Sequence, residues 1–260
     1  MSETINNKKI LVTRPRHQAS QLCELISNGG GHTILFPTIE VRPIINSDVI
    51  LNRFRNLDVY DYIIFVSRNA VKVTFENYLN LKNITDKQQV LAIGSGTASV
   101  LHEIKITNIL HAGIQADSES LLLIPELAQE LICNKKILIV RGVGGRELLA
   151  DSLKKRGAQV DYAEVYERCL PEYGIQECHE IWQNENPDAV VVSSNEGLVN
   201  LVKLTVEADR KQLFNTPLVV MSDRNADLAK ETGFVSEIKV AVEKSDNGLF
   251  STLQEIVGVE

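Results

Sequence analysis

The chain has 260 residues, enough for one large domain or two of ordinary size, and its 44% hydrophobic and 23% charged residues are typical of a globular protein. Its formal net charge of −7 argues against a general nucleic-acid binder, because the affinity of such proteins depends on neutralising phosphates with basic residues. An anionic ligand would instead need a local site, made of a few arginines and backbone N–H groups.

The first predicted strand is the apolar run at residues 10–13, and apolar residues at helical spacing follow it from Ala19 to Ile26. Three consecutive glycines at 29–31 end that helix, and a second strand begins at residue 33. Continuous apolar runs that do not alternate then come at residues 63–66, 90–93, 137–140, 190–192 and 218–220. Such runs are typical of parallel strands covered on both faces. Segments of helical periodicity separate them, and the last predicted helix spans 249–257, so the sequence predicts an α/β fold.

Two segments, 36–41 and 162–167, interrupt this alternation of strand and helix. Both are extended and roughly alternating, and both follow a strand without a helix in between. They occur at corresponding places in the chain. We interpret them as two strands that connect two lobes.

The chain repeats its plan after 127 residues, since residues 8–14 return as 135–141 and residues 61–67 return as 188–194. The repeat predicts two similar lobes, each a parallel sheet flanked by helices, joined by a two-stranded connector. With residues 37–42 and 162–169 as the connecting strands, one lobe comprises 1–36 and 170–260 and the other comprises 43–161. A split of the chain into two consecutive halves fits the repeat equally well.

Each repeated strand ends in small or polar residues, at the sheet edge where ligands of parallel sheets collect. Helix capping by Ser, Asn and Asp explains one such turn without a ligand, but six turns that contain several arginines favour carboxylate or phosphate recognition. The candidate ligand-binding residues in these turns are Arg14, Ser67, Arg68, Asn69, Gly94, Ser95, Thr97, Arg141, Gly142, Gly144, Gly145, Arg146, Ser193 and Ser194. The sixth of these turns contains Asp223 and Arg224, which places an acid among the basic and polar residues, and we assign this turn no role.

The turn at 141–146 is the most distinctive, because its glycines allow close approach of the backbone to a ligand and two arginines flank it. It fits neither GxGxxG nor GxxxxGK[ST], and GxSxG is absent from the chain. Tyr166 is the candidate catalytic residue. A tyrosine on a connector is more often simply half-buried, but at a hinge it would face the cleft between lobes, where a phenol can donate a proton to a departing hydroxyl.

The four cysteines form no CxxC pair and have no histidine at metal-ligand spacing, so we expect buried reduced thiols rather than a metal site or disulfides. The first residues do not resemble a secretory signal, and no apolar run approaches the ~20 residues that span a bilayer. We therefore expect a cytoplasmic protein, a monomer, with a small-molecule ligand and neither nucleic-acid nor membrane partners.

The segments ILIVRGVGGRELL (137–149), KRGAQV (155–160) and EVYER (164–168) resemble bacterial uroporphyrinogen-III synthases. Supporting matches in family order cover nearly the whole chain: ILVTRP (10–15), FPTIE (36–40), FVSRNAV (65–71), AIGSGTA (92–98) and VVSS (191–194). The resemblance implies a cofactor-free lyase that dehydrates and closes the octacarboxylate hydroxymethylbilane to uroporphyrinogen III, inverting ring D through a spiro intermediate, in haem and sirohaem biosynthesis. It also implies two α/β lobes with substrate between them, and Tyr166 falls on the tyrosine that the family is thought to use.

Two other classes of protein share parts of this pattern. A two-lobed cytosolic sensor or carrier would close on a small anion without chemistry, and its lobes and connecting strands would look alike in sequence. A nucleotide-using transferase on the same kind of sheet is disfavoured by the missing phosphate-binding motifs.

Overall fold

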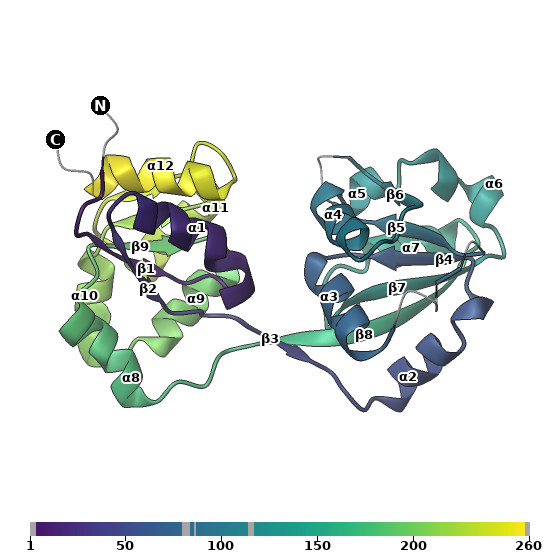
Figure 1. Ribbon diagram of the computed structural model, residues 1–260, viewed down its shortest axis with the longest axis horizontal. Coiled ribbons are helices and arrows are strands. Elements are labelled where there is room, and N and C mark those ends of the chain that lie inside the picture. The colour runs from purple at the N-terminus through teal and green to yellow at the C-terminus, as the bar shows by residue number, and fades with distance from the viewer. Residues whose placement is uncertain (1–3, 80–83, 86, 114–116, 258–260) are drawn as a thin grey trace. The chain divides into compact units, whose positions relative to one another are not determined.

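The computed structural model describes residues 4–79, 84–85, 87–113 and 117–257 (Figure 1). The chain forms two compact units, a first unit of Met1–Glu40 with Cys169–Glu260 and a second unit of Val41–Arg168. The chain passes between them after Glu40 and after Arg168, within the two segments that the sequence predicts to be connecting strands. Two consecutive halves of the chain do not describe these units.

The first unit contains a five-stranded sheet in the order β11-β10-β9-β1-β2, and the neighbouring strands pair in parallel. Its strands are β1 (Lys9–Val12), β2 (His32–Leu35), β9 (Ala189–Val192), β10 (Leu218–Val220) and β11 (Ile238–Val240). Its helices are α1 (Arg16–Asn28), α8 (Ile175–Glu180), the π-helix η4 (Ile181–Glu185), α9 (Asn195–Leu204), the 3₁₀ turn η5 (Glu207–Asp209), α10 (Arg210–Asn215), α11 (Asp223–Thr232) and α12 (Asp246–Val257).

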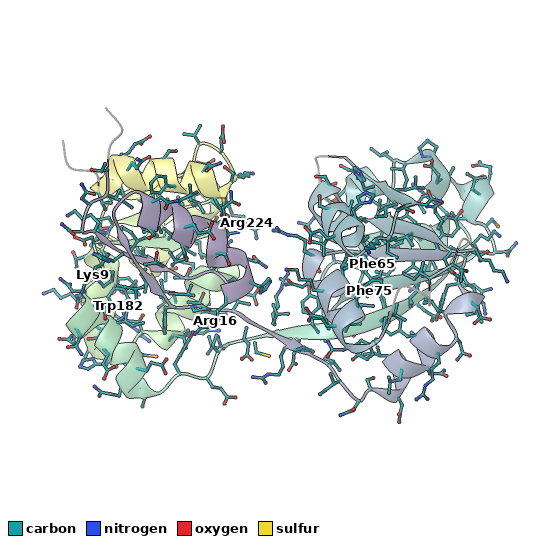
Figure 2. All side chains as sticks on the ribbon, in the orientation of Figure 1. Lys9, Arg16, Phe65, Phe75, Trp182 and Arg224 are labelled. Atoms are coloured by element: carbon teal, nitrogen blue, oxygen red, sulfur yellow. The ribbon has the colours of Figure 1, made fainter. Side chains whose placement is uncertain are left out.

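Helices cover both faces of this sheet, which explains why its strands are continuously apolar. Ile10 and Val12 of β1 pack in one layer with α1 and α12, whereas Leu11 packs in the opposite layer with α9 and α11. Trp182 is the largest side chain of the second layer and is buried (Figure 2).

The second unit contains a six-stranded sheet in the order β3-β8-β7-β4-β5-β6. Its strands are β3 (Glu40–Pro43), β4 (Tyr62–Phe65), β5 (Gln89–Ala92), β6 (Ile109–His111), β7 (Lys136–Gly142) and β8 (Gln159–Cys169). Its helices are α2 (Asp48–Arg55), the 3₁₀ turn η1 (Leu57–Val59), α3 (Arg68–Asn77), α4 (Ser95–Glu103), α5 (Ser118–Leu121), the 3₁₀ turn η3 (Pro125–Leu127), α6 (Gln129–Ile132) and α7 (Leu148–Lys155). Phe65 of β4 packs on Phe75 of α3, with ring centroids 6.1 Å apart (Figure 2).

The predicted connecting strand at 162–169 is part of β8, whose residues Gln159 to Tyr166 pair with β7 inside the second unit. The other predicted connecting strand contributes to β3, which runs antiparallel to β8. The Arg42 guanidinium lies 3.9 Å from the Glu167 carboxylate. The Ile44 N–H donates to the Val165 carbonyl at 2.9 Å. Each sheet is therefore mainly parallel, with one antiparallel edge in the second unit.

The internal repeat is visible in the order of the strands. If β7, β8, β4, β5 and β6 are placed on β1, β2, β9, β10 and β11, the two sheets have the same order. A matching ion pair supports this equivalence: Asp61 binds Lys135 at 2.9 Å, and Asp188 binds Lys8 at 3.3 Å. The first unit is discontinuous because β1 and β2 complete a sheet whose other strands come from the end of the chain.

Among the residues that the structure describes, no helix is both long enough and apolar enough to span a membrane. All four cysteines are free thiols, and Cys178 is buried. Cys23 and Cys169 are only half-buried, and the expectation of burial is wrong for Cys133, which is exposed because it follows a short helix at the surface of the second unit.

Candidate functional site

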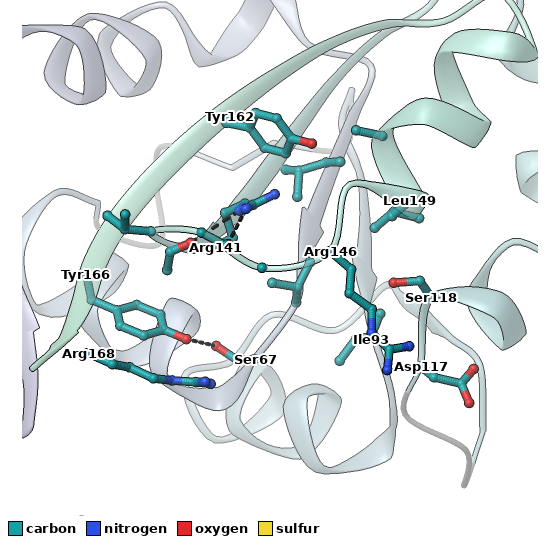
Figure 3. Close-up of a pocket in the computed structure, with 17 residues that line it drawn as sticks. Ser67, Ile93, Asp117, Ser118, Arg141, Arg146, Leu149, Tyr162, Tyr166 and Arg168 are labelled. Atoms are coloured by element: carbon teal, nitrogen blue, oxygen red, sulfur yellow. Dashed lines mark hydrogen bonds between the residues drawn. The ribbon is translucent and has the colours of Figure 1, made fainter. Parts of the chain in front are cut away.

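A pocket of ≈ 400 Å³ lies within the second unit, where the carboxyl ends of its parallel strands meet (Figure 3). Its walls come from the turns after β4, β5 and β7, from the start of α5, from α7 and from the late part of β8. The lining includes Ser67, Asp117, Arg141, Gly142, Gly144, Gly145, Arg146, Tyr162, Tyr166 and Arg168. The structure thus brings seven predicted site residues to one pocket, namely Ser67, Arg141, Gly142, Gly144, Gly145, Arg146 and Tyr166.

A β-bulge sets the direction of the Tyr166 side chain. Arg141 pairs with Glu164 and Gly142 pairs with Tyr166, so Val165 is an extra residue in β8. Bulges of this kind change where the following side chain points. Val165 and Tyr166 are consecutive yet both buried in the same core layer, and the Tyr166 side chain ends in the pocket.

The Tyr166 hydroxyl lies 3.1 Å from the Ser67 hydroxyl, and either oxygen can be the donor (Figure 3). Ser67 caps α3 by accepting from the Ala70 N–H at 3.0 Å. Because that N–H already fixes the Ser67 oxygen, the phenol is held at a defined place beside the helix N-terminus. Ser67 therefore caps a helix and also lines the pocket, and its role in ligand binding stays a prediction.

Gly142 leaves room for the phenol ring. A Cβ atom at this position would lie 2.6 Å from two ring carbons of Tyr166, far inside van der Waals contact. Gly144 and Gly145 serve a different purpose, since their φ angles of 73° and 105° lie in the left-handed region that other residues rarely adopt.

The Arg141 guanidinium makes its contacts with its own turn and with β8. It donates to the Gly144 carbonyl and to Glu147 at 3.0 Å, and it stacks over the Tyr162 ring at 4.5 Å. Its side chain is only 7% exposed. The interactions show how Arg141 shapes the pocket wall, and direct contact between its guanidinium and a ligand stays a prediction.

Two neighbouring groups have shifted pKa values. The Tyr162 hydroxyl donates to Glu147, and this bond, together with that from Arg141, holds the pKa of the Glu147 carboxyl below its usual range. Burial and the Glu147 carboxylate raise the pKa of Tyr162. At neutral pH the phenol is therefore protonated and the carboxylate charged.

Arg146 lies at the rim of the pocket with 73% of its side chain exposed, 3.5 Å from Glu119. Asp117 caps α5 by accepting from the Ser120 N–H at 2.7 Å, and hydrogen bonds to Ser120 lower the pKa of this carboxyl. Arg146 and Asp117 both line the pocket, so its rim carries one positive and one negative charge (Figure 3).

The remaining candidates of the second unit lie in the neighbouring helix starts but outside the pocket lining. Arg68 is exposed and Asn69 is buried, both in the first turn of α3. Gly94 is the N-cap of α4, and Ser95 and Thr97 lie in its first turn. They follow β4 and β5 at the same edge of the sheet as the pocket.

The first unit has its own pocket of ≈ 370 Å³ at the ends of β9 and β10. Ser193 and Ser194 line it, and Ser194 caps α9 by accepting from the Gly197 N–H at 3.0 Å. Arg224 and Lys244 add two positive charges. No motif in the sequence pointed to Lys244, which comes from the loop after β11.

Arg14 lies outside both pocket linings. It pairs with Asp246 at the start of α12, and both side chains are nearly buried, 11% and 12% exposed. Sequence reasoning also missed Arg168 as a site residue. Its spacing of two from Tyr166 on an extended segment is the signal that could have found it, because such residues share one face of a strand.

No group of three or more His, Cys, Asp or Glu side chains suited to a metal ion occurs within the part of the chain that the structure describes. The lining of each pocket offers hydroxyls, backbone groups and cations. Hydroxyls, backbone N–H groups and cations are groups that recognise carboxylates or phosphates.

Comparisons with known proteins agree with the sequence resemblance. A family model described as "Uroporphyrinogen-III synthase HemD" matches residues 20–251. The uroporphyrinogen-III synthase of Escherichia coli (strain K12) is 35% identical over 248 residues, which cover 94% of this chain and 99% of that protein. The same enzyme of Salmonella typhimurium is 34% identical and covers 94% of this chain and 99% of its own length.

Solved structures share the fold. Uroporphyrinogen-III synthetase from Helicobacter pylori 26695 aligns with a TM-score of 0.62 at 16% identity, covering 95% of this chain and 99% of that chain. A mutant uroporphyrinogen III synthase from Thermus thermophilus aligns with a TM-score of 0.56 at 18% identity, covering 95% of this chain and 96% of that chain.

Proposed function

The chain belongs to the uroporphyrinogen-III synthase family, and on this premise we propose that it closes the linear tetrapyrrole hydroxymethylbilane to uroporphyrinogen III with inversion of ring D. The observation that carries the proposal is the family match over residues 20–251. The pocket that holds the Tyr166 and Ser67 hydroxyls among arginines supports it, because the reaction needs a proton donor and partners for carboxylates.

Tyr166 is the proposed proton donor. The C–O bond of the hydroxymethyl group breaks, the phenol gives its proton to the departing oxygen, and water leaves. The pyrrole nitrogen lone pair stabilises the carbocation that remains. The substituted carbon of ring D attacks it to form the spiro intermediate, which opens and recloses with ring D inverted. Loss of a proton from the last ring carbon restores the phenol, so the net change is loss of one water molecule, without an oxidant or cofactor.

Selectivity is the harder task, because the cation also closes spontaneously to the unrotated isomer. An enzyme favours one closure by holding the reacting carbons in the productive geometry, an effect that can supply a large part of a rate enhancement. A flexible octacarboxylate needs several anchoring points to be held in this way. In the second unit Arg146 and Arg168 are proposed to supply such points, and the first unit has candidates of the same kind in its own pocket, namely Arg224, Lys244, Ser193 and Ser194.

By its chemistry the protein would be a hydro-lyase. Its assignment to the cytoplasm and its monomeric state stay predictions of the sequence. The family assignment favours catalysis over the carrier that the sequence alone left open.

The test is a product assay. Purified protein receives freshly generated hydroxymethylbilane, and the porphyrin isomers are separated after oxidation. We expect mainly the type III isomer, against the type I isomer in a control with heat-denatured protein. Type I alone from the native protein would reject the proposed reaction.

A further inference from the structure

Arg168 lies beside the proposed proton donor. It follows Tyr166 by two residues on β8, and side chains at this spacing point to the same side of a strand, about 6.7 Å apart along it. Both residues line the pocket, and Figure 3 shows the Arg168 side chain running alongside the Tyr166 ring toward Ser67. The β-bulge at Val165 therefore directs a phenol and a guanidinium to one place.

The other two arginines of the pocket are placed differently. Arg141 is nearly buried and occupied by Glu147, by the Gly144 carbonyl and by the Tyr162 ring. Arg146 is at the open rim. Arg168 is the arginine of the lining that shares a strand face with Tyr166.

The surface position of Arg168 suits ligand exchange. Arg168 is exposed, and it makes at least one interaction within the protein. An ion pair between exposed groups contributes only about 0–1 kcal/mol, so an exposed arginine can take up a ligand carboxylate at little cost. An arginine can then bind that carboxylate through two parallel hydrogen bonds, which fixes orientation as well as position.

The substrate presents a carboxylate where this geometry needs one. In hydroxymethylbilane the ring carbon next to the one that bears the hydroxymethyl group carries an acetate side chain. A group that binds this acetate would fix the ring that loses its hydroxyl, and a donor on the neighbouring position of the same strand face would reach the hydroxyl.

We propose that Arg168 is a positioning residue that binds this acetate while Tyr166 donates to the hydroxyl of the same ring, an inference that rests on the proposed function. Arg168 would act on binding and on isomer choice more than on proton transfer. The β-bulge would then set the distance between the Arg168 guanidinium, which binds the acetate, and the Tyr166 hydroxyl, which donates the proton.

The test compares Arg168→Gln, Arg168→Lys and the wild type for kcat, KM and isomer ratio. Loss of a charged hydrogen-bond partner should raise KM about ten- to hundredfold, with a smaller change in kcat. The fraction of type III isomer should fall, because loosely held substrate closes spontaneously. The KM and isomer ratio of Arg168→Lys should lie between those of the wild type and of Arg168→Gln, since lysine keeps the charge and loses the two parallel hydrogen bonds.

Arg55→Gln is the matched control, an exposed arginine in the last turn of α2, outside the pocket. It should change KM less than about twofold. Thermal melting of each variant shows whether the fold is kept. An Arg168→Gln enzyme with wild-type KM and isomer ratio, or one that loses kcat alone, would overturn the proposal.

A substrate analogue identifies the carboxylate. If the acetate next to the hydroxymethyl group is replaced by methyl, wild-type enzyme should lose as much affinity as Arg168→Gln loses with the natural substrate. Arg168→Gln should bind the analogue almost as well as it binds the natural substrate. If the two changes instead lowered affinity independently, so that their factors multiplied, the assignment would be refuted. Failure here is distinct from failure of the proposed function, in which even the wild type would yield no type III isomer.

Discussion

The first and second units share one strand order but differ in the contacts made by the turns after equivalent strands. Ser194 and Ser67 are related by the 127-residue repeat, and both cap a helix through a 3.0 Å hydrogen bond. Ser67 in addition contacts the Tyr166 hydroxyl. The repeat thus supplies the same turn twice, and one copy has acquired a further partner.

Arginines at equivalent positions of the two units also make similar contacts. Arg14 and Arg141 are related by the 127-residue repeat and lie near the carboxyl ends of equivalent strands, and each is nearly buried against a carboxylate, Asp246 and Glu147 respectively. Beyond them the units diverge, because β8 has 11 residues and its equivalent β2 has four. The repeat places Ile39 where the second unit has Tyr166. Both units thus place hydroxyls and cations at the ends of their strands, and of the two only the second has the proposed proton donor.

Tyr166→Phe is expected to have the largest effect, because it removes the feature that most separates the units. Loss of a general acid should lower kcat about 100- to 10,000-fold, while the ring still fills its buried position. The check is steady-state kinetics with isomer analysis. Tyr60→Phe is the control, since Tyr60 is also buried in the second unit with its hydroxyl bonded, to Asp161 at 2.9 Å. If Tyr166→Phe kept full turnover and full isomer selectivity, Tyr166 would not be the proton donor, and this difference between the two units would have no role in catalysis.

Gly142→Ala tests whether the place of the phenol matters as well as its presence. The added methyl would lie 2.6 Å from the Tyr166 ring and must displace it. Displacement of a catalytic group by about 1 Å can cost about 100-fold, so kcat/KM should fall by that order. Gly96→Ala, with no atom within 4 Å of the new Cβ, is the control and should keep its activity. Equal rates for the two variants would show that the phenol position is not critical.

The strands of both sheets could be predicted from sequence because their residues are apolar without alternation, as in β4 and β9, which need cover on both faces. The edge strands β6 and β11 were missed. They are three residues long and only partly buried, so they leave no apolar run. The two-stranded connector was predicted, but not that its strands β3 and β8 form the edge of the six-stranded sheet, because alternation shows a strand but not all of its neighbours.

The site was predictable only as far as turns and charges go. Sequence reasoning placed Ser67 and the glycine turn at strand ends and Tyr166 on a connecting strand, and the structure brings them to one pocket. It could not foresee that Arg14 meets Asp246, which is far away in the chain, or that Arg141 is enclosed by its own turn. The bulge at Val165 depends on pairing between two strands and leaves no mark in either one.

Ser67→Ala and Ser194→Ala, the smallest changes, compare the units at equivalent positions. Both should lose about 1 kcal/mol of stability, because each removes a helix cap. Their kinetic effects should differ. Ser67→Ala leaves the Tyr166 hydroxyl without its partner and should lower kcat about three- to tenfold, whereas Ser194→Ala removes a proposed substrate contact and should raise KM by a similar factor.

Ser47→Ala separates these kinetic effects from the loss of a cap. Ser47 caps α2 by accepting from the Ile50 N–H and lies outside both pocket linings, so its loss should lower the melting temperature and leave kcat and KM unchanged. If Ser67→Ala and Ser194→Ala instead changed the same kinetic constant, the two turns would act alike. The second unit would then owe its chemistry to Tyr166 alone, and the contact between Ser67 and the phenol would be incidental to turnover.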